Sequence, residues 1–508
     1  MTTAVSTVDA SVNSRRWWLL GAIVAMATLY SMTILIVGVI LPQIQGTLSV
    51  TPDQISWTIT FNILATAVVT PLTGWLTGRF GWRPVMLSCL AGFTLSTLAC
   101  GLAQSLEQLV VFRVLQGGLG APLVPLAQAV VLSVFPRHQH GLATSIFGMG
   151  VVVGPIFGPV YGGYLSEIYN WRWAFFMIVP FALLALSMLW TLLPEGGKKS
   201  RINFAWTGFI GLAVALSCLQ LILDRGQRLD WFDSAEIVTE AVIGVAGFAV
   251  YLIHSLVSRT PLLNLRLLAI RNYTLGLIIV TVYGMLNFTP MVILPTMLKN
   301  LGGYPESIIG ILIAGRGSGA VVGFFVANWV NRMDPRVGIS AGFLLQAWSG
   351  WHMMGFNMDV AMFDVLLASL TQGLAVGLIW VPLTVSTFAR IDTGYMAETS
   401  AVYHLLRNVG SSIFISLSVT TIIRTSAKNH AHLSEFVSPF NEVLRSFDYA
   451  TIYDLGNLAD LARLNSELTD QAQMIGFLSA FGLYTLMCVA VVPLILLIQP
   501  AKKGAKDT

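Results

Sequence analysis

The stretch Gly150-Val-Val-Val-Gly154-Pro155-Ile-Phe-Gly158-Pro159-Val-Tyr-Gly162 decides how this chain folds. Its four glycines recur at every fourth position, so on a helix they form one smooth stripe along which a second helix can approach closely. The two prolines remove backbone donors and bend the helix, which neighbouring helices tolerate in lipid. The stretch therefore predicts a membrane helix whose glycines and prolines form a packing face. Close packing without any further role is the alternative.

The composition of the chain also indicates a membrane protein. Of 508 residues, 55% are hydrophobic and only 10% are charged, whereas soluble domains carry about 25% charged residues. This balance excludes a soluble enzyme, a disordered protein and a nucleic-acid binder, because a water-facing surface needs charge. The four cysteines lie inside apolar runs without metal-type spacing, so we expect them to pack as small apolar residues.

Fourteen apolar runs are long enough to cross a bilayer, which takes about 20 residues each. We expect spans near 17–41, 55–77, 84–103, 107–132, 141–165, 172–193, 205–223, 236–256, 273–295, 305–330, 337–356, 361–384, 399–423 and 475–498. The sequence thus predicts an all-α integral membrane protein.

Positive charges are concentrated on one side of these spans. With the N-terminus in the cytoplasm, 17 of the 28 Lys and Arg residues fall on the cytoplasmic side and 4 fall in short outer loops. Four more lie in a long outer loop at 424–474, and three lie inside spans. The positive-inside rule then predicts that both termini are cytoplasmic.

The second half of the chain repeats the first. The loop arginine Arg79 matches Arg332 at an offset of 253 residues, and Gln116 of span four matches Gln372 of span twelve at an offset of 256. Spans one to six then correspond to spans nine to fourteen, with spans seven and eight as a central insert. Paired halves with a site between them are the architecture of alternating-access transporters. Shared helix-loop composition is the alternative explanation.

This repeat sets the expected domain boundaries. They are a cytoplasmic tail at 1–16, an N-terminal six-helix bundle at 17–193, a two-helix insert with linkers at 194–272, a C-terminal six-helix bundle at 273–498 that includes the periplasmic loop 424–474, and a cytoplasmic tail at 499–508.

The loop after span two, Gly74-Trp-Leu-Thr-Gly-Arg79-Phe-Gly-Trp-Arg83-Pro84, carries two arginines among tight glycines. Such arginines bind carboxylates or the C-terminal carbonyls of a neighbouring helix. We expect Arg79 and Arg83 either to hold one conformation of a transporter or to act only as positive-inside anchors.

Arginines inside spans are costly, about 2.5–3.5 kcal/mol each on insertion scales, and they usually serve function. Arg113 in span four has Ser369 as its repeat partner, so the packing that both halves share does not require a charge there. We assign Arg113 and the neighbouring Gln116 to conformational change. A buried arginine satisfied by carbonyls is the alternative. The same argument applies to Arg316 and Arg407.

A histidine one helical turn before Arg407, His404, is able to exchange protons near neutral pH. A hydrogen-bonding role in a pocket is equally consistent with its position. No phosphate-binding loop, His-Glu-x-x-His or Cys-x-x-Cys occurs in the sequence, and His430 with His432 alone makes a weak metal motif. We therefore expect no metal, no cofactor and no enzymatic activity.

Taken together, these motifs resemble the major facilitator superfamily, in particular the fourteen-span drug:proton antiporters of the EmrB/QacA type, and the EmrB branch most closely. The resemblance covers about Trp18 to Pro500. The motifs that carry it are the loop 74–84, Arg113-x-x-Gln116-Gly117, Gly154-Pro155-x-x-Gly158-Pro159-x-x-Gly162-Gly163, Trp171-Arg-Trp-Ala-Phe175, Leu405-Leu-Arg407-Asn-Val-Gly410 and 432–441.

The resemblance implies two six-helix bundles with two extra central helices, and a multidrug efflux transporter of the inner membrane. It also implies proton-driven export of hydrophobic or amphipathic compounds by alternating access. The implied partners are drug-like small molecules, protons, a periplasmic adaptor (a membrane fusion protein) and an outer-membrane channel, with no nucleic acid.

The sequence departs from this family in span one, where Thr33 replaces the usual aspartate of proton coupling. We expect His404 and Asp364 to take over this coupling, with Glu398 as a further acidic candidate. Candidate substrate-binding residues are Thr33, Asn62, Arg316 and Tyr403. The missing aspartate leaves an uncoupled or importing carrier of one small molecule as the alternative. A transporter-like receptor is less favoured, because only eight residues follow Pro500.

Overall fold

The computed structural model describes residues 2–194, 204–258, 261–330, 334–438, 440–445 and 456–499, and every regular element in these ranges is helical. The N-terminal half contains α1 (Thr2–Leu48), α2 (Pro52–Val69), η1 (Thr70–Leu72), α3 (Thr73–Phe80), α4 (Trp82–Leu102), α5 (Leu106–Gly120), α6 (Leu123–Val134), η2 (Arg137–Gln139), α7 (His140–Ile168), α8 (Trp173–Phe176) and α9 (Ile178–Leu192).

The described parts of the insert and the C-terminal half are also helical. They contain α10 (Trp206–Arg225), η3 (Trp231–Asp233), α11 (Ala235–Val257), η4 (Leu265–Ala269), α12 (Arg271–Asn300), α13 (Glu306–Val330), α14 (Pro335–Met353), α15 (Met362–Phe388), η5 (Thr393–Tyr395), α16 (Met396–Ser434), α17 (Glu442–Arg445), α19 (Leu458–Ala490) and α20 (Val492–Ile495).

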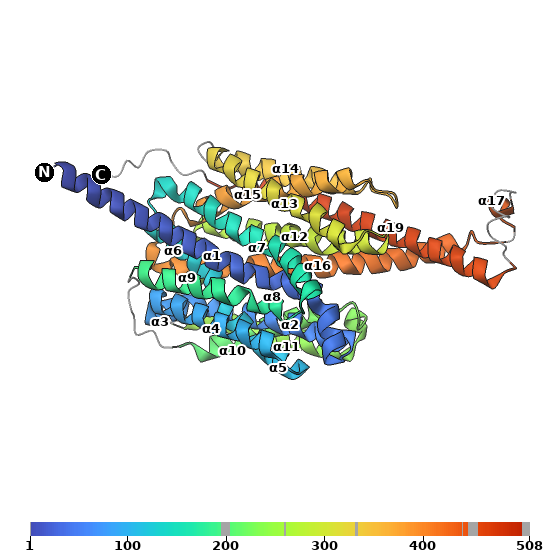
Figure 1. Ribbon diagram of the computed structural model, residues 1–508, viewed down its shortest axis with the longest axis horizontal. Coiled ribbons are helices and arrows are strands. Elements are labelled where there is room, and N and C mark those ends of the chain that lie inside the picture. Colours follow the sequence, from blue (N-terminus) through green and yellow to red (C-terminus); the bar gives the residue numbers. More distant parts are fainter. Residues whose placement is uncertain are drawn as a thin grey trace.

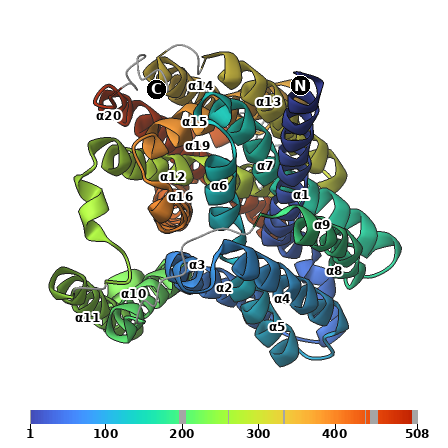
Figure 2. The ribbon, with the colours of Figure 1, turned by 90° about the vertical axis from the view of Figure 1, so that its left-hand side faces the viewer.

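The helices form two bundles and a separate hairpin (Figure 2). One hydrophobic core is built from α1 to α9, and a second is built mainly from α12 to α20. The hairpin of α10 and α11 packs beside α2 and, more weakly, beside α16, with a small apolar cluster of its own. The chain therefore has the predicted arrangement of two bundles and a two-helix insert.

Thirteen helical segments in the described ranges are long and apolar enough to cross a membrane. The helix at the predicted eleventh span, α14, is not among them, because serine, glutamine, tryptophan and histidine lower the hydropathy of its 19 residues. It nevertheless packs lengthwise against α15 and α19 inside the C-terminal bundle. The structure is thus a helical membrane protein in which α14 completes the expected set of fourteen.

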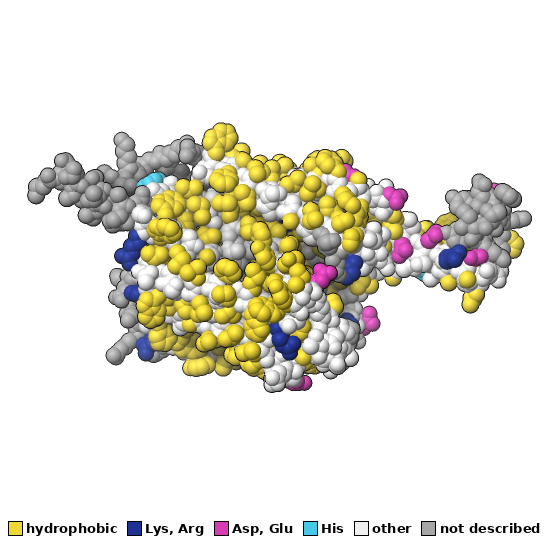
Figure 3. All heavy atoms as spheres, in the orientation of Figure 1, with side chains coloured by type: hydrophobic (Ala, Val, Ile, Leu, Met, Phe, Trp, Pro, Cys, Tyr) yellow, Lys and Arg dark blue, Asp and Glu magenta, His cyan; other side chains and the backbone are white. Residues whose placement is uncertain are grey.

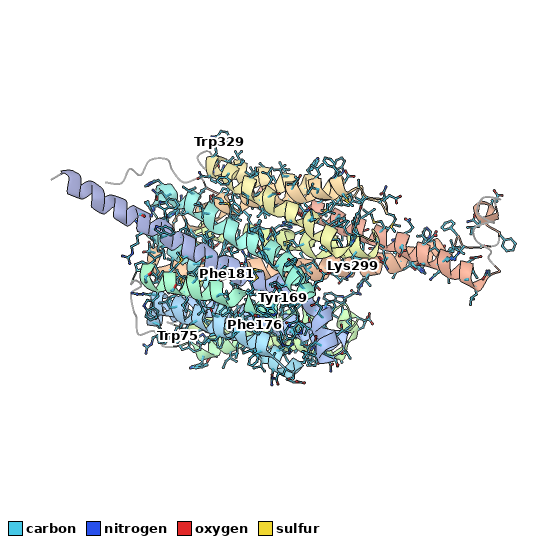
Figure 4. The ribbon with its side chains drawn as sticks, viewed as in Figure 1. Trp75, Tyr169, Phe176, Phe181, Lys299 and Trp329 are labelled. Atoms are coloured by element: carbon cyan, nitrogen blue, oxygen red, sulfur yellow. The ribbon has the colours of Figure 1, made fainter. Side chains whose placement is uncertain are left out.

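The bundle has two distinct ends, which we call the terminal end and the arm end. At the terminal end α1 begins and α20 finishes, while at the arm end α16 and α19 project together beyond the bundle (Figures 1 and 2). Trp75 and Trp329, which are 254 residues apart and occupy matching places in the repeat, both lie toward the terminal end (Figure 4). Apolar side chains cover the flank between the two ends (Figure 3).

Lys198, Lys199, Arg201, Arg259 and Arg332 of the predicted cytoplasmic set, and residues 500–508 of the predicted tail, lie outside the described residues.

The predicted outer loop at 424–474 is largely helical. Helix α16 continues to Ser434, and α19 already begins at Leu458, so the two helices form an antiparallel arm. His430 and Asn465 hydrogen-bond across it at 3.2 Å. In a hydropathy profile, a membrane span ends where polar residues begin. A helix continues past that point when no residue interrupts its backbone, and α16 contains no proline or glycine between Gly410 and Ser434.

The glycine stripe of α7 lies directly on α1. An added Cβ at Gly150 would stand 2.7 Å from the Val24 side chain, one at Gly154 would stand 2.5 Å from the Thr28 carbonyl oxygen, and one at Gly158 would stand 2.6 Å from the Met32 carbonyl oxygen. Both helices step by four residues along this contact. The two backbones therefore approach at a distance that no side chain larger than hydrogen permits.

We expect Gly154→Ala to lower the thermal stability of the purified protein, because the new methyl group would collide with the α1 backbone. Overpacking of this kind costs about 1–3 kcal/mol. Gly38→Ala is the matched control, since an added Cβ at Gly38 of α1 meets nothing within 4 Å. Equal melting temperatures for the two variants in detergent would contradict the close approach.

Candidate functional site

The two bundles meet mainly through five helices. Helix α7 of the N-terminal half packs against α13 and α15, and α16 of the C-terminal half packs against α6. Gly148 of α7 admits the rings of Phe324 and Trp380, which lie 2.6 and 2.8 Å from the position of its missing Cβ. The imidazole of His404 on α16 hydrogen-bonds through Nε2 to the amide oxygen of Gln128 on α6, and both side chains are buried.

A further contact between the halves lies closer to the terminal end. Glu398, in the first turn of α16, stands against Gly74, whose missing Cβ would come 2.8 Å from the glutamate Cβ. The Glu398 carboxylate accepts a hydrogen bond from the backbone N–H of Asn264, in the linker after α11. This acidic residue thus joins α16, α3 and the linker at one point.

Of the loop arginines predicted to control conformation, Arg83 bonds to a helix of its own half. Arg83 donates from Nη2 to the carbonyl oxygen of Trp190, in the last turn of α9, at 2.9 Å. Arg79 lies exposed at the end of α3. Gly74 of this motif makes a contact across the halves, with Glu398.

A cavity lies between the bundles, on the arm side of the His404–Gln128 contact. It is nearly closed in this structure, with room for the centre of a water molecule in only about 20 Å³. The N-terminal half supplies three apolar residues of α7, and the C-terminal half supplies aromatic, polar and cationic groups. The lining consists of Val151, Val152, Pro155, Tyr283, Asn287, Phe288, Met291, Arg316, Trp380 and Arg407.

Pro155 connects the glycine motif to this cavity. As a proline inside α7 it has no N–H for the carbonyl of Val151, four residues earlier, so the helical hydrogen bond is missing there. Both residues line the cavity. The motif therefore packs against α1 through its glycines and faces the cavity through Pro155, while Pro159 lies one turn further along α7.

Arg113 is satisfied inside the N-terminal bundle. Its Nε donates to the carbonyl of Thr58 at 3.2 Å and its Nη1 donates to Oε1 of Gln116 at 2.5 Å. Gln116 in turn donates to the hydroxyl of Thr97 at 2.8 Å. The side chain is 1% exposed. This geometry matches the alternative of a buried arginine satisfied by carbonyls, and a coupling role for Arg113 stays a prediction.

Arg316 has the corresponding position in the C-terminal bundle. It donates to Oε1 of Gln372 at 3.3 Å and to the carbonyl oxygen and side-chain oxygen of Asn287. Gln372 donates to the hydroxyl of Ser349 at 3.2 Å, as Gln116 does to Thr97. Each bundle thus places one guanidinium on the glutamine of its fourth span.

The two arginines come from different helices of the repeat. Arg316 lies 254 residues after Asn62 of span two, so the C-terminal half has an arginine where the N-terminal half has an asparagine. Asn62 instead donates from Nδ2 to the carbonyl of Arg113 at 2.7 Å. The carbonyl of Asn62 lies over Gly117 and the carbonyl of Arg316 lies over Gly373, which supports the predicted alignment of the halves.

Arg407 differs from both. It faces the rings of Trp380 and Phe288, with its guanidinium carbon 5.3 and 5.9 Å from their centroids. Its hydrogen bonds within the described residues go only to Oδ1 of the adjacent Asn408, at 3.2 and 3.4 Å. Unlike Arg113 and Arg316, Arg407 thus has no oxygen acceptor from another helix within the described residues, and several of its five N–H donors are unused.

Of the predicted substrate-binding residues, Arg316 lines the cavity and the other three are satisfied elsewhere in the described structure. The Thr33 hydroxyl donates to the Tyr30 carbonyl of its own helix at 2.7 Å, and the Tyr403 hydroxyl pairs with that of Thr384 at 3.2 Å. Asn62 binds the α5 backbone as described above. These three side chains do not line the cavity, and all three are buried in this structure.

The two predicted coupling groups lie far apart. Asp364 sits in the first turn of α15 at the arm end, with its Oδ1 3.6 Å from Nε2 of His352. His404 packs against Trp380 of α15. Trp380 lies 16 residues after Asp364 on this helix, which is about 24 Å along the helix axis. Any transfer of protons between the two groups would have to cross this length.

Sequence reasoning missed Gln128, Asn287 and Trp380. A signal was present for Asn287, which is the one amide side chain in the span at 273–295, while Gln128 shares its span with Gln108 and Gln116. Trp380 had no such signal, because tryptophan inside a membrane span is ordinary. Only the fold brings it against both His404 and Arg407.

Two bundles related by an internal repeat, with a cavity between them, define a membrane transporter rather than an enzyme. The profile of the Major Facilitator Superfamily matches residues 21–415, and the chain belongs to this superfamily. The multidrug export protein EmrB of Haemophilus influenzae is 31% identical over 471 residues, covering 89% of this chain and 91% of its own.

Two further comparisons agree. The fatty acid resistance protein FarB of Neisseria gonorrhoeae is 29% identical over 470 residues and covers 92% of both chains. The solved structure of the proton:xylose symporter XylE shares the fold, with a TM-score of 0.61 over 95% of both chains at 13% identity. The predicted EmrB type of the superfamily is thereby confirmed, and the small molecules moved by such exporters define the general class of substrate.

The three buried arginines should differ in what they contribute to stability. Arg113→Ala and Arg316→Ala each leave buried acceptors unpaired, at about 1–3 kcal/mol per group, so both should lower the melting temperature in detergent. Arg407→Gln should melt at or above the wild-type temperature, because it removes a charge with few partners. A loss of stability in Arg407→Gln equal to that of the other two variants would show that Arg407 is structural.

Proposed function

We propose that this protein is a proton-gradient-driven multidrug exporter of the inner membrane, which moves hydrophobic or amphipathic compounds by alternating access between its two bundles. The observation that supports this proposal most directly is the cavity between the bundles, which has apolar residues of α7 on one wall and aromatic and cationic groups on the other. Apolar walls with a few fixed polar groups are the usual lining of sites for small molecules.

The contacts between the halves support a mechanism with two states. His404–Gln128, Gly148 with Trp380, and Glu398 with Gly74 all lie between the cavity and the terminal end. We propose that the terminal end faces the cytoplasm, following the predicted excess of positive charge there. These contacts then separate when substrate enters from the cytoplasm, and they form again when the cavity opens outward.

Proton coupling must use a group other than a carboxylate of span one. The hydroxyl of Thr33 is bound to its own helix, and the ten residues lining the cavity include no acidic group. His404 is the titratable side chain that bridges the bundles beside the cavity, and its Nδ1 has no hydrogen-bond partner in the described part of the chain. A proton bound at Nδ1 changes the charge at the contact that must open.

Energised inverted vesicles containing the protein should accumulate fluorescent amphipathic dyes, and nigericin should lower this accumulation by collapsing the pH gradient. His404→Gln and Asp364→Asn, tested singly, should reduce substrate-induced proton release if these groups carry the coupling. Vesicles without the protein are the control. Accumulation undiminished by nigericin would indicate a carrier that is not coupled to protons, and uptake by right-side-out vesicles would indicate an importer.

We also propose that the arm binds a periplasmic adaptor, which in turn meets an outer-membrane channel. Helices α16 and α19 extend beyond the bundle, and large apolar side chains are exposed around the tip: Phe436 at 56%, Phe440 at 86% and Leu458 at 85%. Apolar side chains exposed outside the membrane typically mark contact sites for other proteins.

The double variant Phe436→Ser/Phe440→Ser should abolish co-purification of a co-expressed membrane fusion protein, because it removes apolar area at the tip of the arm. Ser466→Ala, an exposed change elsewhere on the arm, should leave co-purification intact. Dye accumulation in vesicles should be the same for both variants. Undiminished co-purification of the double variant would place the docking site elsewhere.

A further inference from the structure

The cavity between the bundles is positively charged and lacks a compensating negative group. Its ten lining residues include two arginines, Arg316 and Arg407, and no acidic residue. Two described acidic side chains on the helices that line the cavity have other partners. Glu398 accepts from the Asn264 backbone and Asp364 lies beside His352 at the arm end. A ligand that enters the cavity therefore meets an excess of positive charge.

The donors of the two arginines are used to different degrees. Arg316 is held by the carbonyl and amide oxygens of Asn287 and Gln372, so its position is fixed by the protein. Arg407 bonds only to the adjacent Asn408 within the described residues. A guanidinium with free N–H groups binds a carboxylate or sulfonate through two parallel hydrogen bonds. Arg407 is thus available to a ligand, while Arg316 is occupied.

The repeat shows that bundle packing does not require a cation at this place. Gly410 of α16 contacts the carbonyl of Thr281, as Gly154 of α7 contacts that of Thr28, and the offsets are 256 and 253 residues. In the same register Arg407 matches Val151, which lines the opposite wall of the cavity. The same helix-to-helix packing is therefore built with valine in one half and with arginine in the other.

The remaining walls fit an apolar body. Trp380 and Phe288 present their rings beside the Arg407 guanidinium, and Val151, Val152 and Met291 complete the apolar surface. Because the cavity is nearly closed in this structure, with room for the centre of a water molecule in only about 20 Å³, the apolar body of a ligand enters between these walls when the bundles separate. In such a water-poor setting, a charge-assisted hydrogen bond is stronger than at an exposed surface.

We propose that this cavity binds amphipathic monoanions, with the carboxylate or sulfonate of the ligand on Arg407 and its apolar body against Trp380 and Phe288. The inference rests on the proposed function, because it names the substrate class of the same site. It distinguishes this protein from an exporter selective for lipophilic cations, which would need a carboxylate in place of Arg407.

The test measures binding of three probes that share one ring system: 2-naphthoate, the neutral 2-naphthamide and the cationic 2-naphthylmethylammonium. Full-length protein in nanodiscs of zwitterionic lipid is titrated by calorimetry, without a proton gradient. Wild-type protein should bind 2-naphthoate about ten- to a hundredfold more tightly than the other two, the usual effect of one charge-assisted hydrogen bond. Equal affinity for the anion and the amide would overturn the proposal.

Variants assign the preference to the side chain. Arg407→Gln should lower the affinity for 2-naphthoate to that for 2-naphthamide and so remove the preference for the anion, while Arg407→Lys should retain part of this preference. Arg390→Gln, an exposed residue at the terminal end, is the control for net charge and should bind as the wild type does. Retention of the full anion preference in Arg407→Gln would overturn the assignment.

The outcomes separate the two proposals. Anion-selective binding without accumulation in energised vesicles would refute proton-driven export and leave the charge preference standing. Accumulation of anionic, neutral and cationic dyes at equal rates, with equal binding of the three naphthalene probes, would refute the charge preference and leave export standing.

Discussion

A guanidinium inside a membrane protein must find oxygen acceptors, and this requirement organises both bundles. In each half, one arginine donates to the glutamine of the fourth span, and that glutamine donates to a hydroxyl of the third span. The chain Arg113–Gln116–Thr97 ties α5 to α4, and its counterpart ties α13, α15 and α14 together. Because Arg113 and Arg316 are each bonded within their own bundle, the bundles can move against each other without breaking these hydrogen bonds.

The arrangement of the repeat could be predicted from sequence, since matching loops and glutamine-glycine pairs at offsets of 253 and 256 residues survive the divergence of the halves. The glycine stripe likewise indicated a helix contact, although its partner, α1, emerged only from the fold. The arm could not be predicted by hydropathy, which reports where a span leaves the membrane and gives no information on where a helix ends.

The candidate site was harder to predict, because burial alone does not separate a satisfied arginine from a free one. Arg113, Arg316 and Arg407 look alike in sequence, as isolated charges in apolar runs. What distinguishes them is the set of oxygen atoms that other helices bring within reach, and these helices are distant in the chain. Asn287 reaches Arg316 across 29 residues, and Gln128 reaches His404 across 276.

The small hydrogen-bond complement of Arg407 has an electrical consequence. An anion that pairs with this side chain and leaves at the arm end crosses the membrane field, and a cell interior that is negative drives it outward by about 2.3 kcal/mol per elementary charge for each 100 mV. The field itself then performs part of the work of export. Thr33, with its hydroxyl turned back to the Tyr30 carbonyl, is compatible with a carrier that draws on the membrane voltage as well as on the pH gradient.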